Sequence, residues 1–168
     1  GARLRAEFGE KTDGLFPSLS DSIAAASVAQ VHKLETPQGT KAVKILRPGV
    51  EIEFARELEA HAWAARMAER TGGDMRRMKP TALVDTLARS VAIEMDLRLE
   101  AAAAAELAVN TARDDDFRVP MVDWDFTTRR VLATEWIDAT PLKDIEALRA
   151  QGHDLKRIAT SVIQNFLK

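Results

Sequence analysis

The sequence predicts an α+β fold in which an antiparallel sheet packs against long helices. Short apolar runs joined by turn residues occur at 28–44 and again at 121–135, and each has the form of two strands joined by a turn. Long segments with apolar residues at helical spacing lie between and after these runs. Alanine is abundant, and aromatic residues make up only 5% of the chain, which favours closely packed helices over an all-β sandwich.

The first hairpin follows a small-residue loop at 24–27. Its first strand runs through 28–32, and the turn signal Thr-Pro-Gln-Gly occupies 36–39. The second strand reaches Lys44. Pro48 ends this strand, because proline cannot donate a hydrogen bond to a neighbouring strand.

Helical patterns surround the hairpin. A short helix is expected over 2–10. A longer helix begins at Val50 and stops at the glycine pair 72–73. Another begins near Pro80, which suits a first helical turn, and continues through an alanine tract to about Ala112, which would make it the longest element.

The rest of the chain is expected to form a second pair of strands and two short helices. The strands cover 121–124 and 130–135, with a polar turn between them. A connector at 137–141 then leads to helices near 142–150 and 155–168.

The composition limits the classes of function. The 168 residues suffice for one domain or lobe with a sizeable core. A net charge of −2 without a basic stripe argues against a nucleic-acid partner, and the lack of cysteine excludes disulfide and thiolate chemistry. No apolar run approaches the roughly 20 residues that cross a bilayer, so we expect any membrane anchor to lie outside this chain.

Few residues suggest a metal site. Residues 114–116 are three consecutive aspartates, but consecutive acids in a loop rarely converge on one ion without further ligands. His32, His61 and His153 lack metal-ligand spacing and are interpreted as surface or packing residues. We therefore expect no metal ligands in this chain.

The hairpin carries a nucleotide-binding pattern in altered form. Ala24, Ala26 and Ala29 occupy the glycine positions of G-x-G-x-x-G-x-V, which in protein kinases lies over the ATP phosphates, and Val31 occupies the valine position. Lys44 ends an Ala-Val-Lys run where such kinases keep the lysine that pairs with the phosphates. The alternative is an ordinary hairpin with an alanine-rich turn, since Ala-Val-Lys alone is common in strands.

Written with alanines, the stretch 24–32, AAASVAQVH, resembles the loop of the UbiB/ADCK family of atypical protein-kinase-like proteins. The resemblance extends from about Phe8 to the end of the chain and implies a protein-kinase-like small lobe. It assigns 1–138 to this N-terminal lobe with inserted helices, and 139–168 to the hinge connector and the first helices of a truncated large lobe. The implied cofactor is ATP or ADP with Mg²⁺, whose ligands would lie outside this fragment.

The alanines are expected to change how the nucleotide binds. Each alanine adds a methyl group where a kinase loop has none, and it disfavours the positive φ angles that glycine adopts freely. We therefore expect slow or restricted phosphoryl transfer and a nucleotide selectivity unlike that of ordinary kinases.

Lys44 needs a carboxylate partner, because an untethered ammonium on a flexible stem adopts many positions. Glu94, Asp96 and Glu100 lie on the helix expected from Pro80, where Asp96 and Glu100 share a face. They match a second family feature, E-x-D followed by a further glutamate. The resemblance thereby implies that the catalytic residues are Lys44, Glu100, Glu94 and Asp96.

By the same resemblance Glu100 is the partner of Lys44, with Glu94 as the alternative. Glu94 and Asp96 would face the nucleotide pocket or the family's N-terminal extension. A solvated helix face is the other interpretation, since charged residues on helices usually form one.

Residues 131–137 resemble the strand and hinge between the lobes of a kinase, where backbone groups meet the adenine edge. Trp136 and Ile137 are alternatively core residues at the end of a strand. The residues implied to bind the cofactor are Ala24, Ala25, Ala26, Ser27, Val28, Ala29, Val31, Ala42, Lys44, Glu135, Trp136 and Ile137.

The resemblance implies that the chain is the ATP-binding part of a UbiB-like atypical kinase or ATPase that supports ubiquinone biosynthesis. Implied partners are quinone-biosynthesis proteins and lipid precursors, and the implied location is the cytoplasmic side of the bacterial inner membrane. The family's K-x-G-Q motif, catalytic-loop aspartate and asparagine, and Mg-binding Asp-Phe-Gly are absent; Asp125-Phe126 is followed by threonine. We therefore expect no phosphoryl transfer by this fragment alone.

Two other functions remain open. One is a non-catalytic, nucleotide-sensing regulatory scaffold, and the other is a small α+β interaction module unrelated to nucleotides. If the chain is a truncated kinase-like lobe, we expect the fragment to self-associate through apolar surface that the rest of the large lobe would cover.

Overall fold

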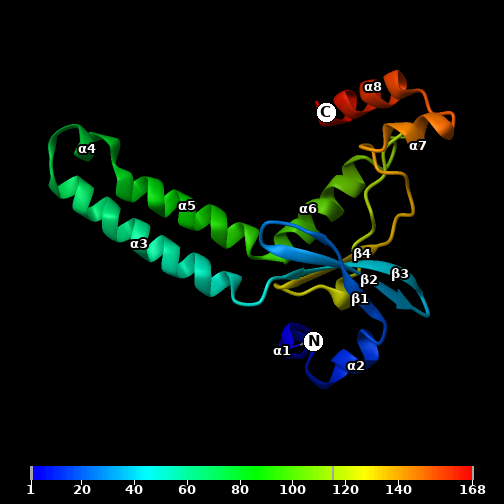
Figure 1. The fold of residues 1–168 in the computed structure, drawn as a ribbon, viewed down its shortest axis with the longest axis horizontal. Coiled ribbons are helices and arrows are strands. Elements are labelled where there is room, and N and C mark those ends of the chain that lie inside the picture. Colours follow the sequence, from blue (N-terminus) through cyan, green and yellow to red (C-terminus); the bar gives the residue numbers. More distant parts are fainter. Residues whose placement is uncertain (1, 115, 168) are drawn as a thin grey trace.

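The computed structural model describes residues 2–114 and 116–167, and an antiparallel sheet lies at its centre (Figure 1). The strands β1 to β4 are adjacent in the order in which they occur in the chain. They are β1 (Leu19–Ala25), β2 (Ala29–Thr36), β3 (Gly39–Leu46) and β4 (Val131–Glu135). The first three form consecutive hairpins, whereas β4 returns from a long helical excursion to pair with β3. The predicted α+β class is confirmed.

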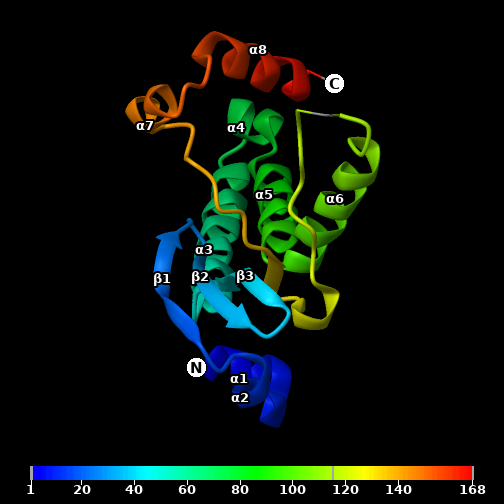
Figure 2. The ribbon, with the colours of Figure 1, turned by 90° about the vertical axis from the view of Figure 1, so that its right-hand side faces the viewer.

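An arm of helices projects from one side of the sheet (Figures 1 and 2). It consists of α3 (Val50–Arg70), the short α4 (Gly73–Met78) at its end, and α5 (Pro80–Glu94), which returns along α3. Val50 and Pro80 start helices, as predicted. Next, α6 (Leu97–Asn110) begins against β4 and leaves the sheet in a different direction.

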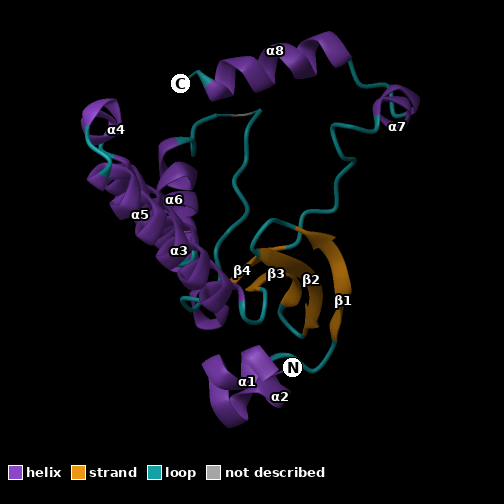
Figure 3. Ribbon diagram, turned by 60° about the vertical axis from the view of Figure 1, so that its left-hand side comes forward, coloured by secondary structure: helices purple, strands orange, loops and turns teal. Residues whose placement is uncertain are grey.

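Shorter helices lie at the two ends of the molecule (Figure 3). Below the sheet are α1 (Ala2–Phe8), the 3₁₀ turn η1 (Gly9–Lys11) and α2 (Thr12–Leu15). At the opposite end, α7 (Ile145–Ala150) and α8 (Leu155–Phe166) follow a long connector and contact each other. None of the described helices is long and apolar enough to span a membrane.

The sheet has a separate core on each face. The core between the sheet and the helices α1 and α2 comprises Leu4, Phe16, Leu34, Val43, Ile45, Val131 and Ala133. The core on the side of the arm and α6 comprises Val28, Ala29, Leu46, Val50, Met95, Leu97, Ala101 and Leu132. Because side chains alternate along a strand, Val43 faces the first core while Lys44 and Leu46 lie on the second face.

A network of charged side chains fastens α1 to the base of the arm and to β4. Glu51, at the start of α3, accepts hydrogen bonds from Arg3 Nη1 at 3.1 Å and from Arg130 Nε at 2.8 Å. Arg130 also donates to Glu7 Oε1 at 2.9 Å. The hydrogen bond from Arg130 is the main cause that lowers the pKa of Glu51, and the two glutamates raise the pKa of Arg130.

Two strand predictions were wrong. Leu19–Ala25 forms β1, although no strand was predicted there and Ala24 and Ala25 were expected in a loop; this edge strand is mostly exposed and lacks the alternation of apolar and polar residues that marks a strand. The segment 121–124 makes only an isolated bridge, Val122 to Thr134. Asp123 accepts a hydrogen bond from Asp125 N at 3.2 Å, which starts the 3₁₀ turn η2 (Trp124–Phe126) instead of extending a strand.

The single long helix predicted from Pro80 to Ala112 is two helices, α5 and α6, that meet at an angle (Figure 1). The break lies at Met95 and Asp96, and α3 is instead the longest helix described, with 21 residues. Met95 and Leu97, on either side of Asp96, are both buried in the same core. A continuous helix would point residues two apart in different directions, so the chain must turn here.

Candidate nucleotide-binding site

Lys44 and Glu100 form an ion pair between the centre of the sheet and α6. Lys44 Nζ donates to both carboxylate oxygens of Glu100, at 2.8 and 2.7 Å. The Lys44 side chain is 26% exposed and that of Glu100 is 48% exposed, so the ammonium is held in place yet remains open to solvent on one side. A fixed, accessible ammonium of this kind is suited to pair with an anionic ligand.

The start of α6 is fixed against β4, and this positions Glu100. Leu97 N donates to Arg129 O at 2.9 Å, just before β4 begins. Leu97 and Ala101 are buried in the core on this face, where the small Ala101 side chain lets the helix approach the sheet closely. Glu100 lies between them in sequence, in the first turn of α6, and reaches Lys44 from there.

The three acidic candidates have different surroundings. Asp96 is the N-cap of α6: it accepts from Arg98 N at 3.1 Å and from the Arg98 guanidinium at 2.9 and 2.6 Å. The side-chain hydrogen bond from Arg98 is the main cause that lowers the pKa of Asp96. Glu94 ends α5, is exposed, and is not the residue that holds Lys44. Asp96 thus precedes the first turn of α6, in which Glu100 lies, and its carboxylate binds Arg98 while that of Glu100 binds Lys44.

The alanine-rich loop is the turn between β1 and β2. Ala24 and Ala25 end β1, and the turn closes with a hydrogen bond from Ala26 N to Ala29 O at 2.9 Å. Among the described residues only Lys79 combines a positive φ with a side chain, so no alanine of this turn needs the backbone angles of glycine. Ala24, Ala25, Ala26 and Ser27 are all exposed.

Val28 and Ala29 differ from the rest of the loop. Both are buried in the core against the arm, and Ala29 is 0% exposed. Their side chains therefore pack the base of the turn and are not on its accessible surface, so only their backbone groups remain for a ligand. Val28 and Ala29 therefore stay predicted cofactor contacts through their backbone groups alone.

The sheet brings further predicted residues around Lys44. Directly opposite residues of antiparallel strands project from the same face, and Lys44 lies opposite Val31 on one side and Leu132 on the other. Ala42 lies opposite Thr134 in the next row on the same face. Small or apolar groups therefore lie beside the ion pair, on Val31, Ala42 and Thr134. A surface that binds the flat face of a nucleotide base requires such groups.

Thr134 belongs to this surface but was not predicted, and Leu132, on the same face of β4, is buried in the core next to it. Alternation along 131–135 is the signal that would identify them, since every second residue faces α6. Which residues those are depends on the register of β4 with β3, and that register pairs segments far apart in the sequence.

The predicted hinge residues Glu135, Trp136 and Ile137 lie at the end of β4 and just after it, and two of their three backbone amides already donate hydrogen bonds within the protein. Glu135 N donates to Met121 O at 2.9 Å, and Trp136 N donates to Thr40 O at 3.1 Å. No hydrogen bond from the Ile137 amide is found within residues 2–114 and 116–167. Of the predicted hinge amides, that of Ile137 is therefore the one left to donate to a ligand.

Two side chains of the hinge contact basic residues of other segments. The Trp136 ring lies beneath Lys33 Nζ, 5.6 Å from the ring centre, and Glu135 pairs with Arg118. Neither is buried in a core, so the alternative interpretation of Trp136 as a core residue is wrong.

Metal ligands do not gather in the part of the chain that the structure describes: no group of three His, Cys, Asp or Glu side chains lies close enough to hold an ion. His32 Nδ1 lies 2.9 Å from Ser20 O, and His61 Nδ1 lies 2.6 Å from Glu57 O, so both rings make local hydrogen bonds. Asp115 lies outside the described residues. The arrangement can therefore bind and orient an anionic ligand through Lys44, but it brings together no metal centre of its own.

A cavity of about 1350 Å³ lies elsewhere, between α8 and the end of α6. Leu107, Phe117 and Ile158 are among its lining residues, and neither Lys44 nor Glu100 borders it. The ion pair and the motif residues, rather than the size of this cavity, identify the candidate site.

Comparisons with known proteins identify the family of the chain. Residues 2–168 match the family model of the ABC1 atypical kinase-like domain. The chain is 33% identical over 165 residues to a protein of Marinobacter nauticus and 34% identical over 167 residues to one of Azotobacter vinelandii, both named "Probable protein kinase UbiB". These matches cover 97% and 98% of this chain but only 30% and 31% of the relatives, so the chain spans about three tenths of their length.

Proposed function

Because the chain belongs to the family of ABC1 atypical kinase-like domains, we propose that it is the ATP-binding part of a UbiB-like atypical kinase or ATPase that supports ubiquinone biosynthesis. The observation that carries the proposal is the ion pair of Lys44 with Glu100 beside the alanine-rich turn. A strand lysine held by a helix carboxylate is the arrangement by which kinases place an ammonium on nucleotide phosphates.

The residues of this chain bind and orient the nucleotide. Lys44 neutralises phosphate oxygens, and Glu100 keeps the ammonium in position. Val31, Ala42 and Thr134 form the surface for the base, and the Ile137 amide donates to its edge. Mg-ATP, when bound, supplies the phosphoryl group.

The exposed turn at 24–27 lies over the phosphates in this proposal. Its methyl groups keep the backbone amides farther from the phosphate oxygens than glycines would, which slows or restricts transfer. The three alanines therefore tune nucleotide preference, and the chain by itself does not transfer phosphate.

The test is a calorimetric titration of the whole protein with Mg-ATP and Mg-ADP, in parallel with Lys44→Ala and Glu100→Gln variants. Each variant is expected to weaken nucleotide binding by about ten-fold or more, because a charge-assisted interaction is lost or the ammonium is no longer held. Lys143→Ala and Glu106→Gln change exposed residues of the same types outside the site and serve as controls. A parent protein that binds neither nucleotide overturns the proposal.

A measurement of phosphate release from ATP distinguishes the kinase or ATPase function from the regulatory alternative. Phosphate release by the parent, lost in the Lys44→Ala variant, supports the kinase or ATPase. Saturable nucleotide binding without any release from the whole protein supports a nucleotide-sensing scaffold instead.

The proposed setting is the cytoplasmic side of the bacterial inner membrane, with quinone-biosynthesis proteins and lipid precursors as partners. Its support is the similarity to proteins named UbiB kinases. Co-fractionation of the whole protein with membranes measures this directly, and recovery of the whole protein without membranes contradicts it.

A further inference from the structure

The end of the helical arm carries an unusual surface. The arm formed by α3, α4 and α5 projects from the sheet as an isolated pair of helices (Figures 1 and 2). We call residues 63–79, which include the end of α3 and all of α4, the arm tip. With 21 residues, α3 is about 30 Å long at the usual rise per residue, so the arm tip lies well away from Lys44 at the sheet.

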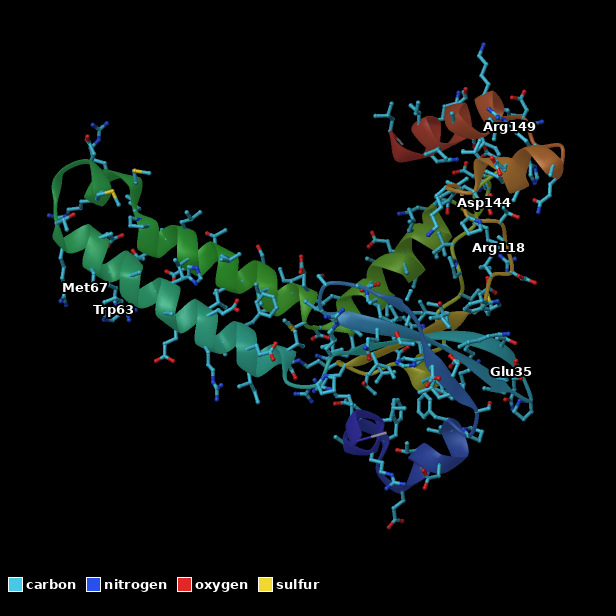
Figure 4. The ribbon with its side chains drawn as sticks, in the orientation of Figure 1. Glu35, Trp63, Met67, Arg118, Asp144 and Arg149 are labelled. Carbon is cyan, nitrogen blue, oxygen red and sulfur yellow. The ribbon has the colours of Figure 1, made fainter. Side chains whose placement is uncertain are left out.

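Large apolar side chains of the arm tip face solvent. Trp63 is 63% exposed and Met67 is 42% exposed, and both point away from α5 (Figure 4). Met78, at the end of α4, is 73% exposed. The inner side of α3 is covered by α5 instead, where Ala65 is buried. Apolar side chains grouped on an outer helix face mark a surface that binds another protein, a ligand or a membrane.

The arginines of α3 lie on the same outer face. At 100° per residue, Arg56, Arg66 and Arg70 fall within one sector around Trp63, whereas four of the five glutamates of α3 fall outside it. The Arg70 guanidinium lies 3.8 Å from the Met67 sulfur, which places these two side chains together. The outer face of α3 is therefore both apolar and basic.

The charge of the arm tip is opposite to that of the rest of the chain. Five of the 24 basic residues and two of the 26 acidic residues lie within 63–79, which gives a net charge of +3 there and −5 elsewhere. One of the two acids, Glu69, accepts hydrogen bonds from Thr81 at 2.6 and 3.1 Å and so faces α5. The basic side chains of the tip are Arg66, Arg70, Arg76, Arg77 and Lys79.

From this surface we propose that the arm tip docks on an anionic lipid bilayer. Exposed Trp and Met side chains among arginines match the interface of a bilayer, where the apolar groups enter the headgroup region and guanidinium groups bind lipid phosphates. The tip is a projecting end, and the cavities beside α8 and beside β4 are lined by other elements, so a soft, flat surface fits it better than a shaped protein segment. The net negative remainder of the chain is repelled by the same surface, which orients the molecule with its arm toward the lipid.

This inference deepens the proposed membrane setting, since it assigns a contact surface within this chain. The experiment is sedimentation of the chain with vesicles of phosphatidylcholine alone and of phosphatidylcholine with phosphatidylglycerol. Binding is expected only with the anionic vesicles and is expected to fall as salt is raised. Arg66→Glu/Arg70→Glu and Trp63→Ser variants are each expected to lower the partition coefficient by about ten-fold or more.

Matched controls are available in the chain. Arg89→Glu changes an exposed arginine of α5, outside the arm tip, and Trp124→Ser changes a 55% exposed tryptophan beside β4. Both are expected to bind vesicles like the parent. Circular dichroism of each variant verifies that it is folded.

Fluorescence measures the contact directly. In a Trp124→Phe/Trp136→Phe background, Trp63 is the remaining tryptophan, since the chain has three. Its emission is expected to shift to shorter wavelength on anionic vesicles and to be quenched by brominated lipids. An emission that does not change while the protein sediments with vesicles overturns the docking of the arm tip.

The other outcomes also discriminate. Equal binding of parent and arm variants leaves the membrane setting in place and overturns this surface. Loss of self-association, rather than of vesicle binding, in the Arg66→Glu/Arg70→Glu variant identifies an interface between copies and overturns the lipid proposal. Nucleotide titration of the same preparations keeps the two proposals separate, because an arm variant that retains nucleotide affinity has lost only the lipid contact.

Discussion

At the scale of single residues, the position of a side chain decides between two chemically equal candidates. Glu94 and Glu100 have the same carboxylate, yet only Glu100 holds Lys44. Glu94 precedes the turn at Asp96 and Glu100 follows it, so the two lie on different helices. The same principle applies to Glu51, whose contribution to stability depends on the two arginines that donate hydrogen bonds to it from other segments.

Glu51 provides a test of pH-dependent stability. Because its pKa in the folded protein is below the ordinary value of 4.5, mainly through Arg130, it contributes stability that is present above about pH 4.5 and is lost as the pH falls through the folded-state value. A Glu51→Gln variant is expected to lower the free energy of unfolding at neutral pH by about 1–3 kcal/mol. Urea unfolding over a pH series should show this difference shrinking in acid.

Glu53→Gln is the matched control, since Glu53 lies in the same first turn of α3 but is exposed. Its unfolding curve is expected to follow that of the parent at every pH. A Glu51→Gln variant with the same loss of stability at neutral and at acid pH would contradict the role of the ionised carboxylate.

At the scale of elements, α6 joins the core to the site. Leu97 and Ala101 pack into the core while Glu100, between them, reaches the sheet. Asp96 caps the helix and so fixes where its first turn begins. Small changes in the approach of α6 to the sheet must therefore change the ion pair as well as the packing.

An Ala101→Leu variant measures this coupling. Ala101 is 0% exposed, so the larger side chain must push α6 away from the sheet, at an expected cost of about 1–3 kcal/mol in the free energy of unfolding. The displaced Glu100 should also weaken Mg-nucleotide binding in calorimetry. Ala102→Leu, an exposed change in the same helix, should affect neither. Unchanged stability and binding in the Ala101→Leu variant would show that α6 has room beside the sheet.

At the scale of the whole molecule, apolar surface is distributed unevenly. The two cores bury the sheet, but α8 exposes Val162 at 48% and Ile163 at 59%. Both belong to α8, which contacts α7 at the end of the molecule opposite α1 and α2 (Figure 3). Exposed apolar side chains on a helix of this kind favour association with another surface.

The isolated chain is therefore expected to self-associate, as its sequence also suggests. Light scattering should give a mass that rises with concentration, and a Val162→Ser/Ile163→Ser variant should reduce this rise. Leu83→Ser, at a 71% exposed position of α5, is the control and should leave it unchanged. A mass that stays monomeric at all concentrations refutes the expectation.

Local sequence was sufficient for most of the fold and for part of the site. Pro80 and the spacing from Val50 predicted where two helices begin, because helix start signals are read from neighbouring residues. The alanine motif and Lys44 were readable for the same reason, since their spacing lies within one hairpin. The family resemblance then added Glu100, which no local rule distinguishes from Glu94.

Only the tertiary structure determined what depends on packing between distant segments. The break at Asp96 follows from burial of Met95 and Leu97 in one core, and a helical pattern continues through it in the sequence. The register of β4 placed Thr134 beside Ala42, and the same pairing left the Ile137 amide without an internal acceptor among the described residues. Periodicity and turn chemistry are properties of neighbours, whereas strand register, helix breaks and ion pairs across the sheet depend on contacts that form when the chain folds.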